Sequence, residues 1–131
     1  MATFVVDGGL AIVTDGLVGG SVTEPKFIGW GTGAGTTLRT DTTLFTEALV
    51  TLAAGTTDHT TGSSSQVTTT TTSDTYQVTG TRTATGSGSV TNAGLWDAAS
   101  GGNLFLKGDF TSIGLVSGDA IAFTIKAIFD N

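Results

Sequence analysis

The sequence predicts an all-β protein: a single antiparallel β-sandwich or jelly roll with one short N-terminal helix. The first observation is a threonine-rich stretch, because ten of the twenty residues in 66–85 are threonine, which is β-branched and favours pleated strands. The second is a series of short alternating segments separated by glycine-rich turns, which is typical of sandwiches and jelly rolls. No long loop or change in composition divides the chain, so we expect one domain over residues 1–131.

The chain begins with MATFVV, residues 1–6, which is extended and apolar. We expect this segment to act as an N-terminal arm. It either pairs with a neighbouring chain by β-augmentation or forms the first strand of the protein's own sandwich. The candidate partner-contact residues are Thr3, Phe4, Val5 and Val6. The start has neither the basic residues nor the long apolar stretch of a signal peptide.

A helix is expected over residues 7–20. Leu10, Val13 and Leu17 recur at three- and four-residue spacing, which places them on one helix face. Asp7 is predicted to cap the start of the helix, and the Gly19-Gly20 pair to end it. Such a short helix would close one end of the sandwich.

Strand and turn signals alternate after the helix. Residues 26–30 (KFIGW) form a short apolar strand that the glycines of GTGAG interrupt. Residues 43–53 (TLFTEALVTLA) carry large apolar groups on both faces, which favours a central strand or one that crosses between layers. Residues 55–65 (GTTDHTTGSSS) are polar and rich in glycine and serine, which predicts a flexible loop.

The threonine-rich stretch is predicted to form two strands around a turn at Ser73-Asp74. In the second strand Tyr76 and Val78 face the core. The alternate positions carry Gln77 and a row of threonines, as an antiparallel strand with one solvent-exposed face requires.

Three further strands complete the prediction. Residues 89–96 place Val90 and Trp96 in one register, and residues 103–110 place Leu104, Leu106 and Phe110 on one face. Residues 120–129 (AIAFTIKAIF) alternate regularly. The side chains of this last strand expected to point inward are Ile121, Phe123, Ile125 and Phe129, with Lys126 pointing outward.

The composition excludes several classes of function. Charged residues make up 12% of the chain, against about 25% in an average protein, and the net charge is −6. The five basic residues are scattered, so nucleic acid and anionic membranes are improbable partners. No apolar run approaches the roughly 18 residues that span a bilayer.

Residues suited to catalysis or metal binding are few. The chain has no cysteine and one histidine, His59, which makes a zinc site improbable. His59 is expected to be an exposed loop residue, because Asp58 beside it would point to the opposite face of an extended chain. The acidic residues form no Asp-x-Asp loop for calcium. The sequence therefore predicts no enzyme, no metal and no cofactor.

Aromatic residues offer one alternative binding site. Trp30, Tyr76 and Trp96 could form a platform on which a sugar stacks, with Trp30 and Tyr76 as its main members. Because Trp96 lies in a regular alternating pattern, core packing is the better interpretation for that residue.

Several motifs together resemble a known family. They are PKFIGWGTGAGTT at 25–37, DTTLFTEA at 41–48, TYQVTGT at 75–81, VTNAGLWDAASGGNLFLKGDF at 90–110 and SGDAIAFTIK at 117–126. Together they resemble small structural proteins of tailed bacteriophages, labelled head-decoration (cement) or tail-fibre proteins. The resemblance covers most of the chain from Leu10 onward, and the 55–65 loop matches none of the family's motifs.

The resemblance implies a virion component without catalytic activity. As a capsid decoration protein, it would be assembled in the host cytoplasm and bind the outer face of the phage head. There it would stabilise contacts between subunits of the major capsid protein, as a homotrimer. The alternative is a carbohydrate- or receptor-binding module of a tail fibre or baseplate.

Overall fold

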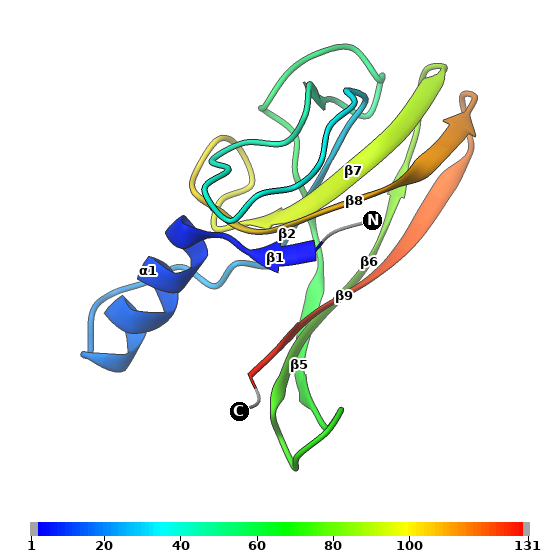
Figure 1. Ribbon diagram of the computed structural model, residues 1–131. Helices are drawn as coiled ribbons and strands as arrows, with labels where there is room; N and C mark the ends of the chain where they lie inside the picture. The colour runs from blue at the N-terminus through cyan, green and yellow to red at the C-terminus, as the bar shows by residue number, and fades with distance from the viewer. Residues whose placement is uncertain (1–2, 130–131) are drawn as a thin grey trace.

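The computed structural model describes residues 3–129 as two packed antiparallel sheets and one helix (Figure 1). The predicted all-β sandwich with one short N-terminal helix is confirmed. In chain order the elements are β1 (Thr3–Val5), α1 (Asp7–Leu17), β2 (Phe27–Gly31), β3 (Glu47–Ala48), β4 (Thr60–Thr61), β5 (Ser63–Val67), β6 (Thr75–Thr83), β7 (Gly88–Trp96), β8 (Leu104–Leu115) and β9 (Ala120–Ile128).

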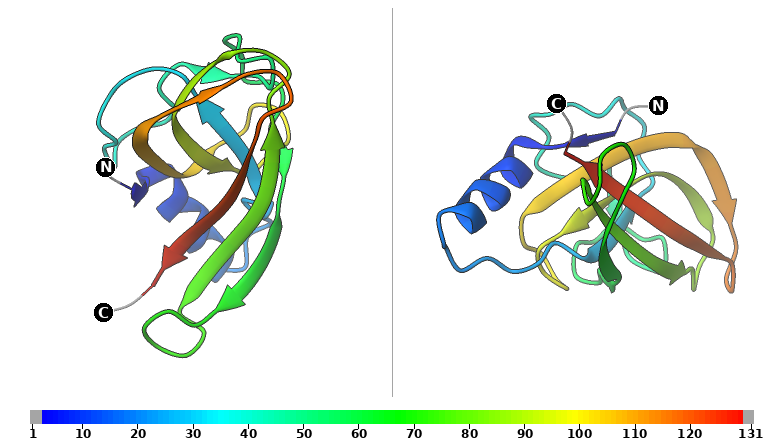
Figure 2. Two further views of the ribbon diagram at one scale, coloured as in Figure 1. Left: turned by 90° about the vertical axis from the view of Figure 1, so that its right-hand side faces the viewer. Right: turned by 90° about the horizontal axis from the view of Figure 1, so that it is seen from below.

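The larger sheet, sheet A, has the strand order β1-β8-β7-β2-β3, and β4 pairs with β2 beside β3. The smaller sheet, sheet B, has the order β5-β6-β9. The chain passes between the sheets from β4 to β5, from β6 to β7 and from β8 to β9, and the β8–β9 turn lies at one end of the sandwich (Figure 2). At this end the Ala84 N–H donates a hydrogen bond of 2.7 Å to the carbonyl oxygen of Asp119, which ties the turn to the chain after β6.

The main core lies between the two sheets. From β2 the side chains of Ile28 and Trp30, both fully buried, point toward sheet B. Val78 of β6 and Leu95 of β7 pack against Ile28 in the same cluster. Burying apolar side chains of this size contributes about 1.5–3 kcal/mol each, so this layer supplies most of the driving force for folding.

Residues 32–59 form an outer layer, which covers the other face of sheet A and continues along its β2 edge, where Glu47–Ala48 (β3) joins the sheet. The first part of this segment (cyan) lies on the far side of sheet A from sheet B in Figure 2. The apolar cluster under this outer layer contains Val6, Leu44, Trp96, Leu104 and Phe27. Gly31 shows how closely the outer layer approaches, because a Cβ there would lie 2.4 Å from the carbonyl oxygen of Phe45. This close approach explains a glycine beside Trp30.

The helix is confirmed in position, but its N-terminal cap differs from the prediction and it ends earlier. Asp7 is the first helical residue rather than the cap; the cap residue is Val6, which offers no side-chain hydrogen bond. The carboxylate of Asp7 instead pairs with Arg39 at 3.0 Å. The helix ends at Leu17, and Gly19 follows with a φ of 84°, a conformation that favours glycine. Helix α1 projects from one end of the sandwich and packs on β8 (Figure 1).

The predicted strand over residues 43–53 is wrong. Only Glu47–Ala48 (β3) pairs in this segment. Thr46 and Leu52 adopt φ values of 47° and 65°, which break an extended strand on either side of β3. Large apolar groups occur on both sides of this segment because it lies in the outer layer, where Leu44 packs on sheet A while Leu52 packs toward the main core.

The boundary between the 55–65 segment and the threonine stretch also differs from the prediction. The predicted flexible loop over residues 55–65 contains all of β4 and the start of β5, which ends at Val67. The five consecutive threonines, 68–72, therefore form the turn and not a strand. Asp74 explains this turn, because its carboxylate accepts hydrogen bonds from three backbone N–H groups in it, at 2.7–2.9 Å. In β6 the predicted orientation holds, with Val78 buried and Thr79 exposed.

Two irregularities in the β7–β8 pairing change which face several side chains occupy. Register shifts occur between Val90 and Asn92 and between Leu95 and Trp96. As a result Val90 lies in the core between the sheets, whereas Trp96 lies under the outer layer. The second shift places Leu104 and Leu106 on opposite faces of sheet A, although the sequence predicted them on one face.

The last strand follows the predicted alternation. Burial alternates along β9 from Ala120 to Ala127, with Lys126 pointing outward as expected. Phe129 lies just beyond the end of β9; it lines a hollow with Tyr76 and Phe105 but remains 48% exposed, so it is not a buried core residue.

Candidate functional site

His59 is buried under the outer layer and is not the exposed loop residue expected from the sequence. Its ring stacks on Trp96 with centroids 5.0 Å apart and an interplanar angle of 9°. Nδ1 lies 2.8 Å from the carbonyl oxygen of Ala98, and Nε2 lies 2.5 Å from Oε1 of Glu47. Both ring nitrogens thus face acceptors, and a neutral imidazole has one N–H. The imidazole is therefore held at both ends, by the Ala98 carbonyl oxygen and by the Glu47 carboxylate.

Arg82 connects sheet B to the outer layer. It is 1% exposed although it lies on β6, and its guanidinium contacts Asp58 through an ion pair of 2.6 Å. The same group donates hydrogen bonds to the carbonyl oxygens of Asp58 and Ala48 at 2.5 and 3.1 Å. It also lies 4.8 Å from the centre of the Trp30 ring, a distance suited to a cation–π interaction. Arg82 thus crosses the space between the layers.

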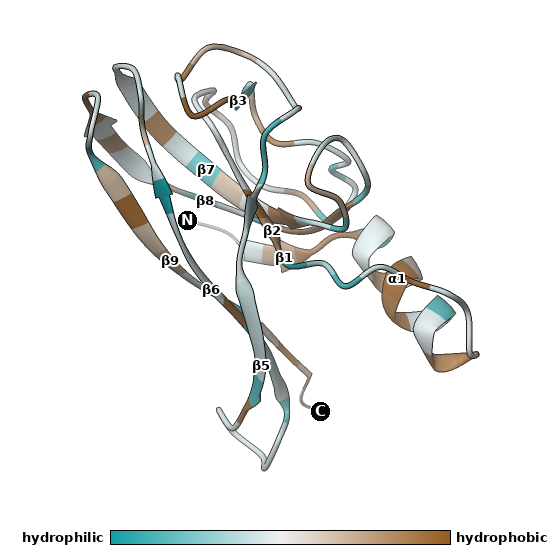
Figure 3. Ribbon diagram, turned by 180° about the vertical axis from the view of Figure 1, so that it is seen from behind, coloured by the Kyte–Doolittle hydropathy of each residue, from teal (hydrophilic) through white to brown (hydrophobic). Residues whose placement is uncertain are grey.

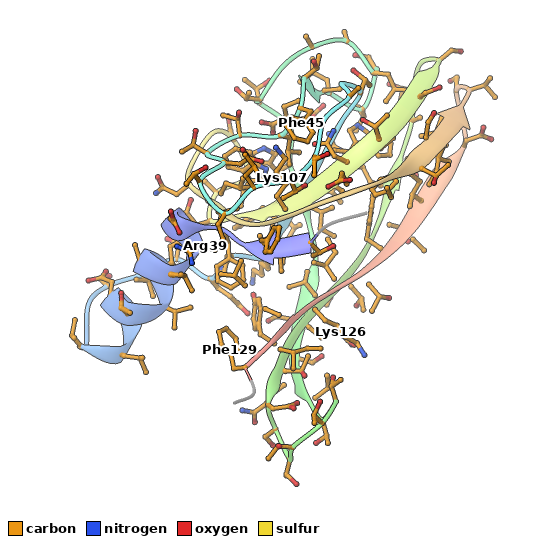
Figure 4. The ribbon with its side chains drawn as sticks, in the orientation of Figure 1. Arg39, Phe45, Lys107, Lys126 and Phe129 are labelled. Carbon is orange, nitrogen blue, oxygen red and sulfur yellow. The ribbon has the colours of Figure 1, made fainter. Side chains whose placement is uncertain are left out.

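Lys107 anchors the outer layer at a second point. Its side chain, 1% exposed, leaves β8 and forms an ion pair of 2.9 Å with Asp41 and a hydrogen bond of 2.8 Å to the carbonyl oxygen of Thr43. The ammonium group also lies 3.3 Å from the centre of the Phe45 ring, as Figure 4 shows for the two labelled side chains. Burial alone would raise the pKa of Asp41, but the Leu38 N–H and Lys107 hold it below its ordinary value.

These polar side chains hold the outer layer and are poorly placed for catalysis. His59, Arg82 and Lys107 are buried, and their polar atoms contact neighbouring segments of the same chain. Within residues 3–129 no group of three or more acidic, histidine or cysteine residues could hold a metal ion.

One of the three buried basic side chains had a detectable signal in the sequence. Arg82 has the same parity in β6 as Tyr76 and Val78, so the alternation already placed it on the core face. His59 had no such local signal, because its partners Glu47 and Trp96 are distant in sequence. Lys107 is buried by a loop that the sequence did not place over β8.

The four residues proposed for partner contact lie at the edge of sheet A. Thr3, Phe4 and Val5 form β1, which pairs antiparallel with β8 from Leu106 to Gly108. Phe4 is 41% exposed, whereas Val6 is fully buried. Of the two alternatives for this segment, the structure shows the first strand of the protein's own sandwich. The other edge of β1 pairs with no strand in the described residues.

The aromatic residues proposed as a sugar platform do not lie on one exposed surface. Trp30 is fully buried and donates its indole N–H to the carbonyl oxygen of Leu49 at 3.0 Å. Tyr76 is half-buried, packs edge-on against Phe105 and donates its hydroxyl to the carbonyl oxygen of Pro25. Burial, with the nearby Glu24 carboxylate, raises the pKa of Tyr76 above its ordinary value. Trp96 is 4% exposed, as its predicted core position implies.

The outer face of sheet B is the candidate interaction surface. Its three strands present hydroxyl, amide and small apolar side chains in register; in Figure 3 these strands are pale over much of their length, with brown bands on β9 and teal bands on β5 and β6. The cross-strand rows of this face are Ser63–Thr79–Thr124, Ser65–Gln77–Lys126, Thr81–Ala122 and Thr83–Ala120. Lys126 is the single charged side chain in these rows. These rows are thus nearly free of charge.

Two apolar hollows flank sheet B. One of about 270 Å³ lies between α1 and the end of sheet B and is lined by Ile12, Val13, Tyr76 and Phe129 among others. The other, of about 210 Å³, lies between the edges of β8 and β9. The first has no cluster of convergent polar groups of the kind that binds a small substrate, whereas the second is bordered by Thr3, Asp109, Thr124 and Lys126 beside its apolar residues. No helix within residues 3–129 has the length and apolar character needed to cross a membrane.

Comparison with known proteins gives one match. A family model described as "Podophage GP4 fiber I protein gp80" matches residues 15–129, which contain every strand except β1. No curated protein and no solved structure matches the chain.

Proposed function

Because the chain belongs to the podophage GP4 fiber I protein gp80 family over residues 15–129, we propose that it is a non-enzymatic structural subunit of a phage fibre. Membership of this family makes it a bacteriophage structural protein and a virion component. Its place in a fibre and its lack of activity are the parts that we propose. The head-decoration label, which the sequence resemblance also suggested, has no support from the family match.

One observation carries the proposal: the side chains that are chemically suited to catalysis are used to hold the layers together. The imidazole, a guanidinium and an ammonium group are each buried against partners in the outer layer. The main exposed surface of sheet B carries hydroxyl and small side chains. Such a body is rigid and soluble without many charges, which suits a part that bears load among many copies.

The location is tested by labelling the protein in intact virions. An epitope added at the C-terminus and detected by gold-conjugated antibody should appear on the fibres and not on the head. Labelling over the head, together with saturable binding of purified protein to empty heads, would refute the fibre proposal and favour capsid decoration. If the protein labels the head, we expect it to contact the major capsid protein.

Recognition of a carbohydrate or receptor is a separate question for a fibre subunit. Because Trp30 is fully buried, a sugar could not stack on it without rearrangement of the sandwich. We therefore place any contact with other virion parts on exposed features, either sheet B or the β1 edge with Thr3, Phe4 and Val5. A Phe4→Ser variant that still incorporates normally into virions would remove β1 from this proposal.

A further inference from the structure

Strand β9 has one edge that pairs with no other strand. All nine of its residues pair with β6 in an uninterrupted register, from Ala120 opposite Thr83 to Ile128 opposite Thr75. Within residues 3–129 no strand pairs with its other side, because β9 ends the order of sheet B. Figure 1 shows β9 along the outside of the sandwich, reaching from the β8 turn to the C-terminal end.

This edge has only one of the usual features that prevent pairing between chains, the exposed Lys126. Protected edges are short, bulged, interrupted by proline, or carry lysines or inward-pointing charges. Strand β9 has no proline and no register shift, and its inner positions carry Ile121, Phe123 and Ile125. The other terminal strands, β1, β3 and β5, have three, two and five residues, so β9 is the longest edge strand of the two sheets.

The inner face along the β9 edge is also incompletely covered. The hollow of about 210 Å³ between β8 and β9 is lined by Leu106, Phe110, Phe123 and Ile125, among others. Phe123 and Ile125 are partly exposed even though they pack against the core clusters. A strand added beside β9 would place its own inner side chains next to these two residues.

The charges of β9 are compatible with a second copy of this chain as the added strand. The chain carries a net charge of −6, so two copies repel each other wherever carboxylates meet. Strand β9 contains no acidic residue, and its one charged side chain is Lys126. Two copies can therefore meet along this strand without opposing carboxylates.

The sequence of β9 is also compatible with pairing to itself. We propose that two copies join through antiparallel β9–β9 pairing about a two-fold axis at Thr124, which gives one continuous six-stranded sheet. In this register, the one that pairs the whole strand, Ala120 lies opposite Ile128 of the partner subunit. Phe123 lies opposite Ile125 of the partner subunit, an aromatic and β-branched pair that stabilises sheets. Lys126 faces Ala122 of the partner subunit, so no like charges are opposed.

This inference depends on the strand edge and not on the fibre proposal. Sedimentation equilibrium of the purified full-length protein should give twice the 13.1 kDa chain mass. A monomer at all accessible concentrations would overturn the proposal. A trimer, the state implied by the phage-family resemblance, would also overturn it, because a two-fold axis closes with two copies.

Because the chain has no cysteine, single cysteines report the register directly. Two Thr124→Cys side chains would meet at the axis within disulfide distance, so oxidised glutathione should cross-link this variant rapidly. The matched control is Ser65→Cys, an exposed position in β5 on the same face. Equal rates for the two variants would contradict the proposed axis.

A charge variant tests the same contact without a cross-linking reaction. Thr124→Asp places two carboxylates opposite each other across the axis, so the dimer should dissociate with a Kd raised at least tenfold. Thr81→Asp adds the same charge to the same face at an exposed position of β6, the central strand, and should leave the dimer intact. If circular dichroism shows both variants folded and both remain dimers, the β9 pairing is wrong.

Discussion

Replacing Arg82 with methionine should weaken the attachment of the outer layer to the sandwich. Methionine keeps the apolar length of the side chain but removes the guanidinium. Four hydrogen bonds are lost, to Asp58 Oδ1, the carbonyl oxygens of Asp58 and Ala48, and the Thr60 hydroxyl, together with the contact over Trp30. The carbonyl oxygen of Ala48 then remains buried without this partner.

The size of the effect follows from the burial of the two charges. Removing one member of a buried ion pair costs about 3–5 kcal/mol. Asp58 is 35% exposed, so solvent screens part of the lost attraction and we expect about 3 kcal/mol. Against a total stability of about 5–15 kcal/mol, this loss is large and should lower the Tm by about 10 °C.

Urea unfolding followed by tryptophan fluorescence measures this loss. The matched control is Arg39→Met, which removes an exposed ion pair with Asp7 and should cost less than about 1 kcal/mol. Asp58→Asn should fall between the two, because it removes the charge and keeps an acceptor. If Arg82→Met costs no more than Arg39→Met, the buried pair does not join the layers.

Three further predictions concern other parts of the fold. Gly9→Ala should destabilise the protein by about 1–3 kcal/mol, because its Cβ would lie 2.0 Å from the Phe105 carbonyl oxygen. Gly16→Ala has its nearest neighbour at 3.6 Å and should stabilise α1 by about 0.5–1 kcal/mol; thermal melts of both variants check the contrast, and equal shifts would contradict it. The backbone N–H of Thr71, with those of Thr69 and Thr70, lowers the pKa of Asp74 below its usual range. Asp74 therefore stabilises the fold fully above the unfolded pKa of about 3.9, and this contribution falls as the pH drops below that value. The stability difference between wild type and Asp74→Asn should shrink on acidification, and a constant difference from pH 6 to 2 in urea titrations would refute this. Because both indole rings are buried, iodide should quench tryptophan emission weakly and host glycans should leave it unchanged; a glycan-induced shift would indicate an opened platform.

The sequence predicted the strands whose two faces have different surroundings. In β6 and β9 one face meets the core and the other meets solvent, so the alternation of Val78 with Thr79 or Ile125 with Lys126 reports burial directly. The strand over residues 43–53 failed for the opposite reason. That segment pairs only at Glu47–Ala48, and Leu44 and Leu52 pack on different clusters, so its apolar residues reflect local contacts rather than a period of two.

The candidate surface was predictable in part. The row of exposed threonines was expected from the sequence, and the structure adds β9 with Lys126 beside it. The buried positions of His59 and Lys107 depend on contacts with Trp96 and Asp41, which are distant in sequence. The five threonines at 68–72 were assigned to a strand because β-propensity outweighed the effect of Asp74, whose hydrogen bonds to the backbone determine the turn.

The outer layer affects how freely this protein can change its sequence. A strand must keep its pairing at every residue, whereas residues 32–59 are attached mainly at separate points, such as the contacts of Asp41 with Lys107, His59 with Trp96 and Asp58 with Arg82. Side chains between these points, such as the exposed Leu38, can be replaced without loss of packing. Mutations should therefore accumulate between the attachment points without loss of the fold. This layer could vary its outward surface while the two sheets remain unchanged.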